Sequence, residues 1–154
     1  MKEETKKLLD ELLLKPNAGF LATVDENGVP SIRSVYNLRC KESFPYSVKV
    51  INEYDSYPYT IYISTNTSSV KIKHIRKNPN VAIYFSLPKE IKGIMLQGKA
   101  EIMEDMEFKK AIWEDDWAQF YPKGPTDPDF TMLKIKPTLL RGWYKGHHHH
   151  EFED

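Results

Sequence analysis

The chain has 154 residues and a mass of 18.0 kDa, about the size of one domain. Apolar residues make up 40% of it and charged residues 29%, a balance typical of soluble globular proteins. Lys and Arg together number 22, as do Asp and Glu, so the net charge is zero. This argues against a protein that coats nucleic acid or an anionic membrane, because both attract a surplus of cations.

Targeting and redox signals are few. Cys40 is the single cysteine, which excludes an internal disulfide and fits a reducing compartment. The N-terminal residues have no uncharged apolar core of signal-peptide length, and no run of about 18 apolar residues occurs. We therefore expect a cytoplasmic protein without nucleic-acid or membrane partners. Residues 1–146 are expected to form its one domain, and residues 147–154 a His-rich and acidic C-terminal tail.

Most of the chain has the pattern of β-strands. Gly93–Met103 alternates regularly, with Ile94 and Leu96 on one face and Met95 and Gln97 on the other. Most links between strands are too short for a parallel crossover. A mainly β fold follows, a largely antiparallel sheet closed as a barrel with flanking helices. The predicted strands are Gly19–Val24, Pro30–Leu38, Tyr59–Ser64, Asn80–Ser86, Gly93–Met103, Phe130–Lys136 and Thr138–Tyr144.

Helical periodicity occurs in three segments, and one further segment is irregular. Trp113, Trp117 and Tyr121 recur at intervals of four and indicate a core or dimer contact. For residues 40–58 we expect a long excursion with a short strand near residues 47–51. Its tyrosines either cover an edge strand or line a substrate pocket. The predicted helices are residues 2–14, 69–77 and 105–121.

The stretch from Ser64 to Lys71 (STNTSSVK) joins the end of a strand to the start of a helix. A helix N-terminus presents unpaired N–H groups and a partial positive charge, and Lys71 and Lys73 add full charges. This arrangement predicts an anion pocket, and phosphate is the common occupant of such places. The alternative is ordinary capping of the helix by Ser68 or Ser69.

Arg33 lies in the middle of a predicted strand. A charge that faces a barrel interior is costly unless it is paired, and a planar guanidinium suits bidentate binding of phosphate. The alternative is an arginine that faces the solvent.

Four segments together resemble the pyridoxamine 5′-phosphate oxidase-like FMN-binding split barrels, and more narrowly their small general-stress-protein type. They are GFLATVDENGVPSIRSV, TNTSSVKIKHIRKNPNVAIYF, IMLQGKAEI and KIKPTLLRGW, in that order between about Gly19 and Tyr144. The resemblance implies a six-stranded antiparallel split barrel. It also implies a homodimer with FMN in each of two clefts between the subunits.

The resemblance assigns residues to the cofactor as well. The family's T-N-x-x-S-x-K pattern matches Thr65, Asn66, Ser69 and Lys71, of which the serine and the lysine hold the FMN phosphate. Arg33 matches an arginine of the second strand. No metal ligand and no catalytic acid or base is assigned. The expected FMN-binding residues are Arg33, Ser34, Val35, Ser64, Thr65, Ser69, Lys71, Gln97 and Trp143.

The sequence departs from the oxidase pattern at several positions. Val70 stands where the oxidases have an arginine just before the phosphate lysine, and Gln97 takes the acidic position before Gly98. The C-terminal arginine and histidine that grip the pyridoxine substrate have no match. Their absence from this sequence argues against true pyridoxamine-phosphate oxidase activity.

These features predict an FMN-dependent oxidoreductase that exchanges electrons with a small-molecule donor or acceptor, while the residues do not identify the substrate. One alternative is a non-catalytic module on the same barrel, a flavin or haem carrier, sensor or stress-response protein, with His74 as a candidate haem ligand. Another is a barrel that binds single-stranded nucleic acid through Lys71, Lys73 and neighbouring cations. His147–His150 is either a metal-binding cluster or an expression-tag remnant.

Overall fold

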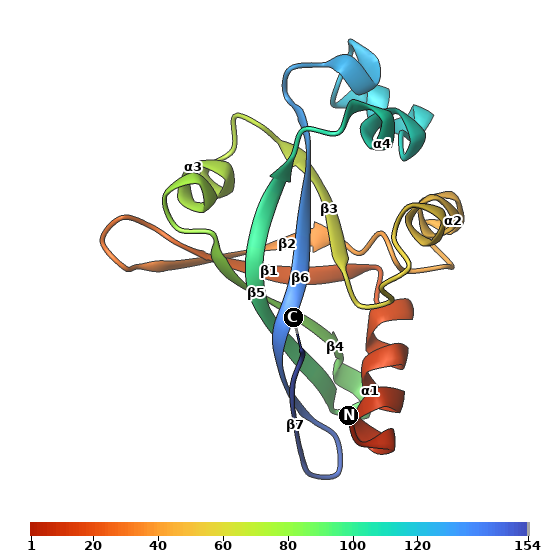
Figure 1. Ribbon diagram of the computed structural model, residues 1–154, viewed down its shortest axis with the longest axis vertical. Helices are drawn as coiled ribbons and strands as arrows, with labels where there is room; N and C mark the ends of the chain where they lie inside the picture. Colours follow the sequence, from red (N-terminus) through yellow and green to blue (C-terminus); the bar gives the residue numbers. More distant parts are fainter. Residues whose placement is uncertain (154) are drawn as a thin grey trace.

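The computed structural model describes residues 1–153 and shows a curled antiparallel sheet with helices at its edges (Figure 1). Six strands follow the order β2-β1-β4-β5-β6-β3, and β7 pairs with β6. All pairs are antiparallel, so the predicted mainly β, six-stranded antiparallel barrel is confirmed. The strands are β1 (Ala18–Val24), β2 (Pro30–Tyr36), β3 (Ile61–Asn66), β4 (Asn80–Leu87), β5 (Lys92–Met103), β6 (Phe130–Trp143) and β7 (His147–Glu151).

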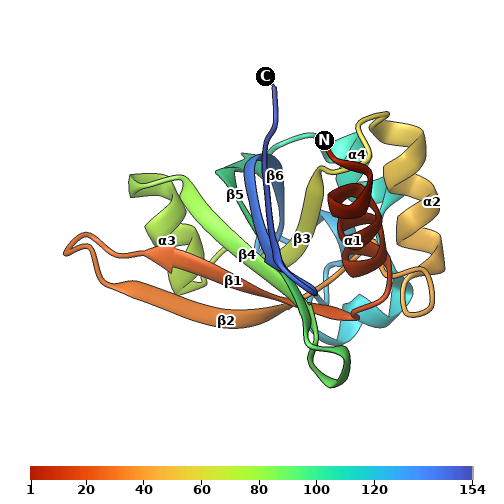
Figure 2. The same ribbon diagram turned by 90° about the horizontal axis from the view of Figure 1, so that it is seen from below.

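The helices lie on different sides of the barrel. Figure 2 shows α3 beside the β1–β2 hairpin, with α1, α2 and α4 grouped on the other side. No helix within residues 1–153 is both long enough and apolar enough to cross a membrane. The helices are α1 (Glu3–Leu14), α2 (Pro45–Tyr54), α3 (Val70–Lys77) and α4 (Met106–Ala111), with 3-10 turns η1 (Pro88–Glu90), η2 (Asp115–Gln119) and η3 (Gly124–Thr126).

Two apolar clusters fill the molecule. The leucine stripe of α1 closes the barrel, and Leu9 and Leu12 are fully buried in one cluster with Ile83 and Phe85. A second cluster is rich in aromatic rings and lies between α2, β3 and the segment that joins β5 to β6. Its members are Leu38, Val50, Ile51, Tyr62, Met103, Phe108, Ile112, Trp117, Tyr121, Phe130 and Met132.

The short strand expected near residues 47–51 is wrong, because these residues belong to α2. Pro45 stands in the first turn, where a missing N–H leaves no hydrogen bond unmade. Ser47, Val50 and Ile51 form the buried face of the helix. Valine and isoleucine favour strands only where a sheet surface is there to receive them, and here the aromatic cluster receives them instead.

The single helix expected over residues 105–121 is also wrong. Asp105 caps α4 by accepting from the N–H groups of Glu107 and Phe108, but α4 ends at Ala111 and only the 3-10 turn η2 follows. The aromatic residues of the predicted stripe still pack together, but not as one face of a helix. Trp113, Trp117 and Tyr121 each contact the ring of Phe130, with ring centroids between 5.1 and 5.8 Å apart.

The two strands expected on either side of Pro137 are one strand, β6. Pro137 lies opposite Gly98, where the register of β5 shifts between Gln97 and Gly98. The irregularity accommodates Pro137, because a proline has no N–H to donate to the ladder. Gly98 is required there, since a Cβ atom would lie 2.4 Å from the carbonyl oxygen of Lys136.

The C-terminal residues expected as a tail include a strand. Residues 147–151 form β7, which pairs with Leu139–Trp143 of β6. His148 fixes this hairpin to α1, since its Nδ1 lies 3.0 Å from Thr5 Oγ1. Asp154 lies outside the described residues.

Replacing Leu9 with alanine tests the closure of the barrel by α1. We expect a loss of about 2–5 kcal/mol in the free energy of unfolding, because the deletion leaves a cavity in a fully buried position. Urea denaturation measures it. Leu14→Ala, at a residue of the same helix that is 48% exposed, is the control and should change stability by less than about 0.5 kcal/mol. Equal losses in the two variants would contradict the role given to α1.

Candidate functional site

A cleft of about 370 Å³ lies between β2 and β3, the two ends of the six-strand path. The N-terminal part of α3 and the segment that follows α4 border the same cleft. Residues from four separate parts of the sequence meet there, so only the folded chain forms the cleft. The lining residues are Ala18, Ser34, Val35, Tyr36, Ser64, Thr65, Asn66, Lys71, Trp117, Phe120 and Tyr121.

One end of the cleft is cationic. Lys71 is half-buried, and its Nζ donates to Thr65 Oγ1 at 2.7 Å. Burial lowers the pKa of Lys71, and the positive charge of Arg33 lowers it further. Neither cation forms an ion pair with a carboxylate among residues 1–153. Two desolvated like charges without a counter-ion favour the binding of an anion.

Uncharged groups hold Arg33 in place. Its Nη1 donates to the carbonyl oxygens of Leu21 and Ser31, each at 3.1 Å, and to Thr23 Oγ1 at 2.8 Å. Thr23 Oγ1 also lies 2.9 Å from His74 Nδ1. Because Thr23 accepts from Arg33, its own proton is available to His74. The guanidinium is therefore oriented without being neutralised.

The start of α3 adds an unpaired hydroxyl. Ser69 is the N-cap residue, with extended backbone angles (φ −72°, ψ 152°), but its side chain makes no capping hydrogen bond. Its Oγ is buried and has no hydrogen-bond partner. Buried hydroxyls are normally bonded, so an orphaned one at a helix N-terminus, two residues before Lys71, fits a phosphate group.

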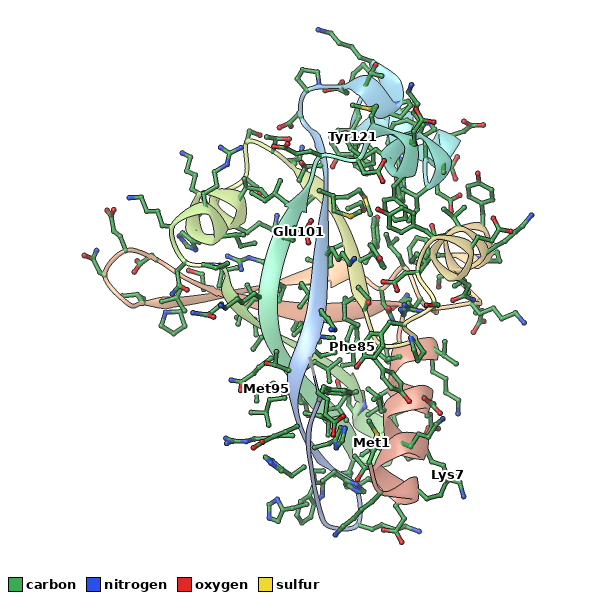
Figure 3. The ribbon with its side chains drawn as sticks, viewed as in Figure 1. Met1, Lys7, Phe85, Met95, Glu101 and Tyr121 are labelled. Carbon is green, nitrogen blue, oxygen red and sulfur yellow. The ribbon has the colours of Figure 1, made fainter. Side chains whose placement is uncertain are left out.

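The opposite wall of the cleft is aromatic. Trp117 and Tyr121 are buried, whereas Phe120 is 53% exposed at the mouth. The Tyr121 hydroxyl donates to Asn66 Oδ1 at 3.4 Å, and burial raises the pKa of Tyr121 to about 12. Figure 3 shows Tyr121 within the segment between β5 and β6, near the end of β3. The cleft thus combines a cationic end with an apolar wall.

The structure brings most of the predicted cofactor residues together. Ser34, Val35, Ser64, Thr65 and Lys71 line the cleft. Arg33 and Ser69 are not among the lining residues, but the charge of Arg33 acts on Lys71, and Ser69 stands two residues before Lys71 at the start of α3. Tyr36 and Phe120 are not among the predicted residues, and the spacing of Trp117 and Tyr121 predicts core or dimer contacts. Asn66 belonged to the matched pattern, which was the available signal for that residue.

Gln97 and Trp143 lie away from the cleft, on the face of the sheet that is turned away from α1. Figure 3 shows this separation of faces, with Phe85 toward α1 and Met95 on the opposite side. We call the exposed side the outer face. Strand register places Gln97 beside Ala82, and Met95 beside Tyr84. The large apolar side chains exposed there are Phe20, Ile32, Tyr36, Tyr84 and Trp143.

The two remaining candidates have different surroundings. His74 faces a separate hollow beside the β1–β2 hairpin and not the cleft. His147 and His149 lie on the exposed side of β7, where His149 contacts Glu151 at 3.6 Å. Within residues 1–153, no group of three or more His, Cys, Asp or Glu side chains is placed to hold a metal ion.

The fold and the cleft define an antiparallel split barrel with a cationic cleft between the two ends of its strand path. The chain belongs to the pyridoxamine 5′-phosphate oxidase family, whose model matches residues 5–144. It is 32% identical over 101 residues to the pyridoxine/pyridoxamine 5′-phosphate oxidase of Citrobacter koseri. That match covers 66% of this chain but only 39% of the relative, so the chain spans less than half of the relative's length.

Solved structures share the fold over most of their length. A protein related to general stress protein 26 from Clostridium acetobutylicum has a TM-score of 0.71 at 24% identity, over 96% of this chain and 92% of that one. An FMN-binding, pyridoxamine 5′-phosphate oxidase-related protein from Nostoc punctiforme gives 0.65 at 15% identity, over 95% and 85%. A haem-binding protein from Mycobacterium smegmatis gives 0.67 at 15%, over 98% and 59%. The resemblance drawn from the sequence is confirmed.

Replacing Lys71 with methionine tests the strain at the cationic end. We expect the urea midpoint of the ligand-free protein to rise, because the variant loses a desolvated charge that Arg33 repels. The gain should shrink as the pH rises through the lowered pKa of Lys71, since the wild-type lysine then loses its own charge. Lys73→Met, at an exposed position of α3, is the control. A lower midpoint for Lys71→Met would show that its bond to Thr65 outweighs the repulsion.

Proposed function

We propose that this chain binds FMN in the cleft between β2 and β3 and acts as a flavin-dependent oxidoreductase. The observation that carries the proposal is the start of α3, where Lys71 feels the charge of Arg33 and the Ser69 hydroxyl is buried without a partner. A phosphate monoester carries a charge of about −1.5 to −2 at neutral pH and would supply the missing counter-ion. The FMN-binding neighbour from Nostoc punctiforme supports the choice of ligand.

The residues of the cleft have distinct roles in this proposal. Arg33 and Lys71 bind the phosphate, and Ser69 Oγ donates to it. The backbone at Ser34 and Val35 lies along the ring, while Ser64 and Thr65 meet the ribityl chain. When bound, FMN supplies the transfer of one or two electrons between a small-molecule donor and acceptor. The protein's part is to orient the flavin and to exclude water from it.

A homodimer completes the proposed site. The outer face exposes five large apolar side chains on neighbouring strands, which is unusual for a surface that meets only water. Tyr36 belongs both to the outer face and to the cleft lining, so a second copy seated on this face would also border the cleft. Gln97 and Trp143 would then contact the flavin bound to the other subunit.

The alternative is a non-catalytic flavin or haem module. The cleft lining that the structure describes contains no histidine and no carboxylate, and the pKa of Tyr121 at about 12 keeps that hydroxyl protonated near neutral pH. Proton transfer is efficient when the pKa of the group lies near the operating pH, so the lack of such side chains in the described lining favours a carrier. Oxidation of NAD(P)H by the FMN-loaded protein separates the enzyme from the carrier. A cytoplasmic location is part of both proposals, and Cys40 is a buried free thiol.

Removing both cations tests the phosphate site. We expect Arg33→Ala with Lys71→Ala to weaken FMN binding at least tenfold, because hydrogen bonds to charged groups contribute roughly 1.5–3 kcal/mol each. Titration of flavin fluorescence measures the affinity, and riboflavin, which lacks the phosphate, should lose far less. Lys73→Ala is the matched control from the same helix. Unchanged FMN affinity in the double variant would place the phosphate elsewhere.

Placing a charge on the outer face tests the dimer. We expect the wild-type protein to sediment as a dimer and Phe20→Glu to sediment as a monomer that retains less FMN, because the charge would be buried between subunits. Analytical ultracentrifugation gives the mass. Ile91→Glu, at a residue that is 73% exposed in a turn, is the control and should remain dimeric. A monomeric wild-type protein would refute this arrangement.

A further inference from the structure

The loop Asn66–Ser69, which joins β3 to α3, is held by one residue far along the chain. Asp129 accepts from Asn66 Nδ2 through Oδ2 at 2.7 Å and from the backbone N–H of Ser68 through Oδ1 at 2.8 Å. The carbonyl oxygen of Asp129 accepts from the N–H of Thr67 at 2.8 Å. Three consecutive residues of the loop are therefore bonded to Asp129.

Asp129 is itself fixed from its own side. The Oδ1 atom of Asp127, a residue that is only 7% exposed, accepts from the N–H of Asp129 at 2.9 Å. The other carboxylate oxygen of Asp127 accepts from the N–H of Lys123 at 3.1 Å. Phe130, the next residue along, is buried in the aromatic cluster and pairs with Asn66 in the sheet. The loop is thus tied to a rigid support.

The charge of Asp129 makes this arrangement informative. Hydrogen bonds from Asn66 and Ser68 lower the pKa of Asp129, so it is an anion at neutral pH. A carboxylate close to a phosphate site opposes phosphate binding by simple repulsion. Any contribution of Asp129 to phosphate binding must therefore come from the conformation of the loop that it holds.

That shape decides what Ser69 does. A serine at a helix N-cap normally turns its hydroxyl onto the N–H groups of its own helix. Here Asp129 holds the N–H of Ser68, the residue just before, and the Ser69 hydroxyl makes no such bond. We propose that Asp129 is a positioning residue that keeps the loop from closing on itself and so reserves Ser69 for the FMN phosphate. The inference rests on the proposed function and deepens it.

Asn66 has a second partner that makes the proposal testable by a conservative change. The Tyr121 hydroxyl donates to Asn66 Oδ1, and a tyrosine hydroxyl can also accept. In Asp129→Asn, rotation of the Asn66 amide lets its oxygen accept from the new amide and its NH₂ group donate to Tyr121. The N–H of Ser68 keeps its acceptor, so this variant should preserve the loop.

The test compares FMN with riboflavin for each variant by fluorescence titration. The dissociation constant of riboflavin divided by that of FMN reports the contribution of the phosphate. We expect Asp129→Ala to lower this ratio about tenfold and to leave riboflavin binding nearly unchanged, and Asp129→Asn to restore most of it. Asp25→Ala is the matched control, since Asp25 also accepts from two loop N–H groups, those of Asn27 and Val29, but in the β1–β2 hairpin.

Each outcome separates the two proposals. If the wild-type protein binds FMN no better than riboflavin, the phosphate site and this inference both fail. If the wild type prefers FMN and Asp129→Ala keeps or increases that preference, Asp129 acts only as a nearby charge and this inference alone is overturned. If Asp129→Ala does not fold, Asp129→Ser, which retains one acceptor, replaces it. The ratio should then fall by less than the tenfold expected for alanine. An unchanged ratio in that variant would overturn the inference too.

Discussion

The repulsion between Arg33 and Lys71 is the constraint around which the rest of the site is arranged. Both are partly desolvated, and their hydrogen-bond partners are hydroxyls and carbonyl oxygens, which orient a cation without cancelling its charge. Folding brings them together at a cost that no carboxylate among the described residues offsets. Strain of this kind persists only where the surrounding structure enforces it, and here the β1–β2 hairpin and α3 do so.

The aromatic cluster builds the wall of the cleft opposite its cationic end. It gives the segment between β5 and β6 a fixed position despite its short helices, because Trp117 and Tyr121 pack on Phe130 at the start of β6. The segment then forms one wall of the cleft and supports the loop before α3. The two ends of the cleft are therefore connected through packed rings and a few hydrogen bonds.

Much of this was predictable from the sequence, and the failures have physical causes. Periodicity located most strands, and the spacing from Ser64 to Lys71 located the cationic end, because both depend on neighbours in the chain. α2 was missed because Val50 and Ile51 favour strands until a distant cluster receives them. Tyr36 and Phe120 were missed because their role depends on which strands lie beside the cleft, and local sequence carries no such information.

The pairing of β7 has a consequence for the sheet's exposed edge. β6 is longer than β3, which pairs only with residues 130–135 of β6. β7 pairs with residues 139–143 of β6, the part that β3 leaves uncovered. An uncovered strand edge is a template for pairing with another chain. The backbone of β7 thus protects this part of the sheet from edge-to-edge aggregation, and the His148 imidazole holds the protecting hairpin against α1.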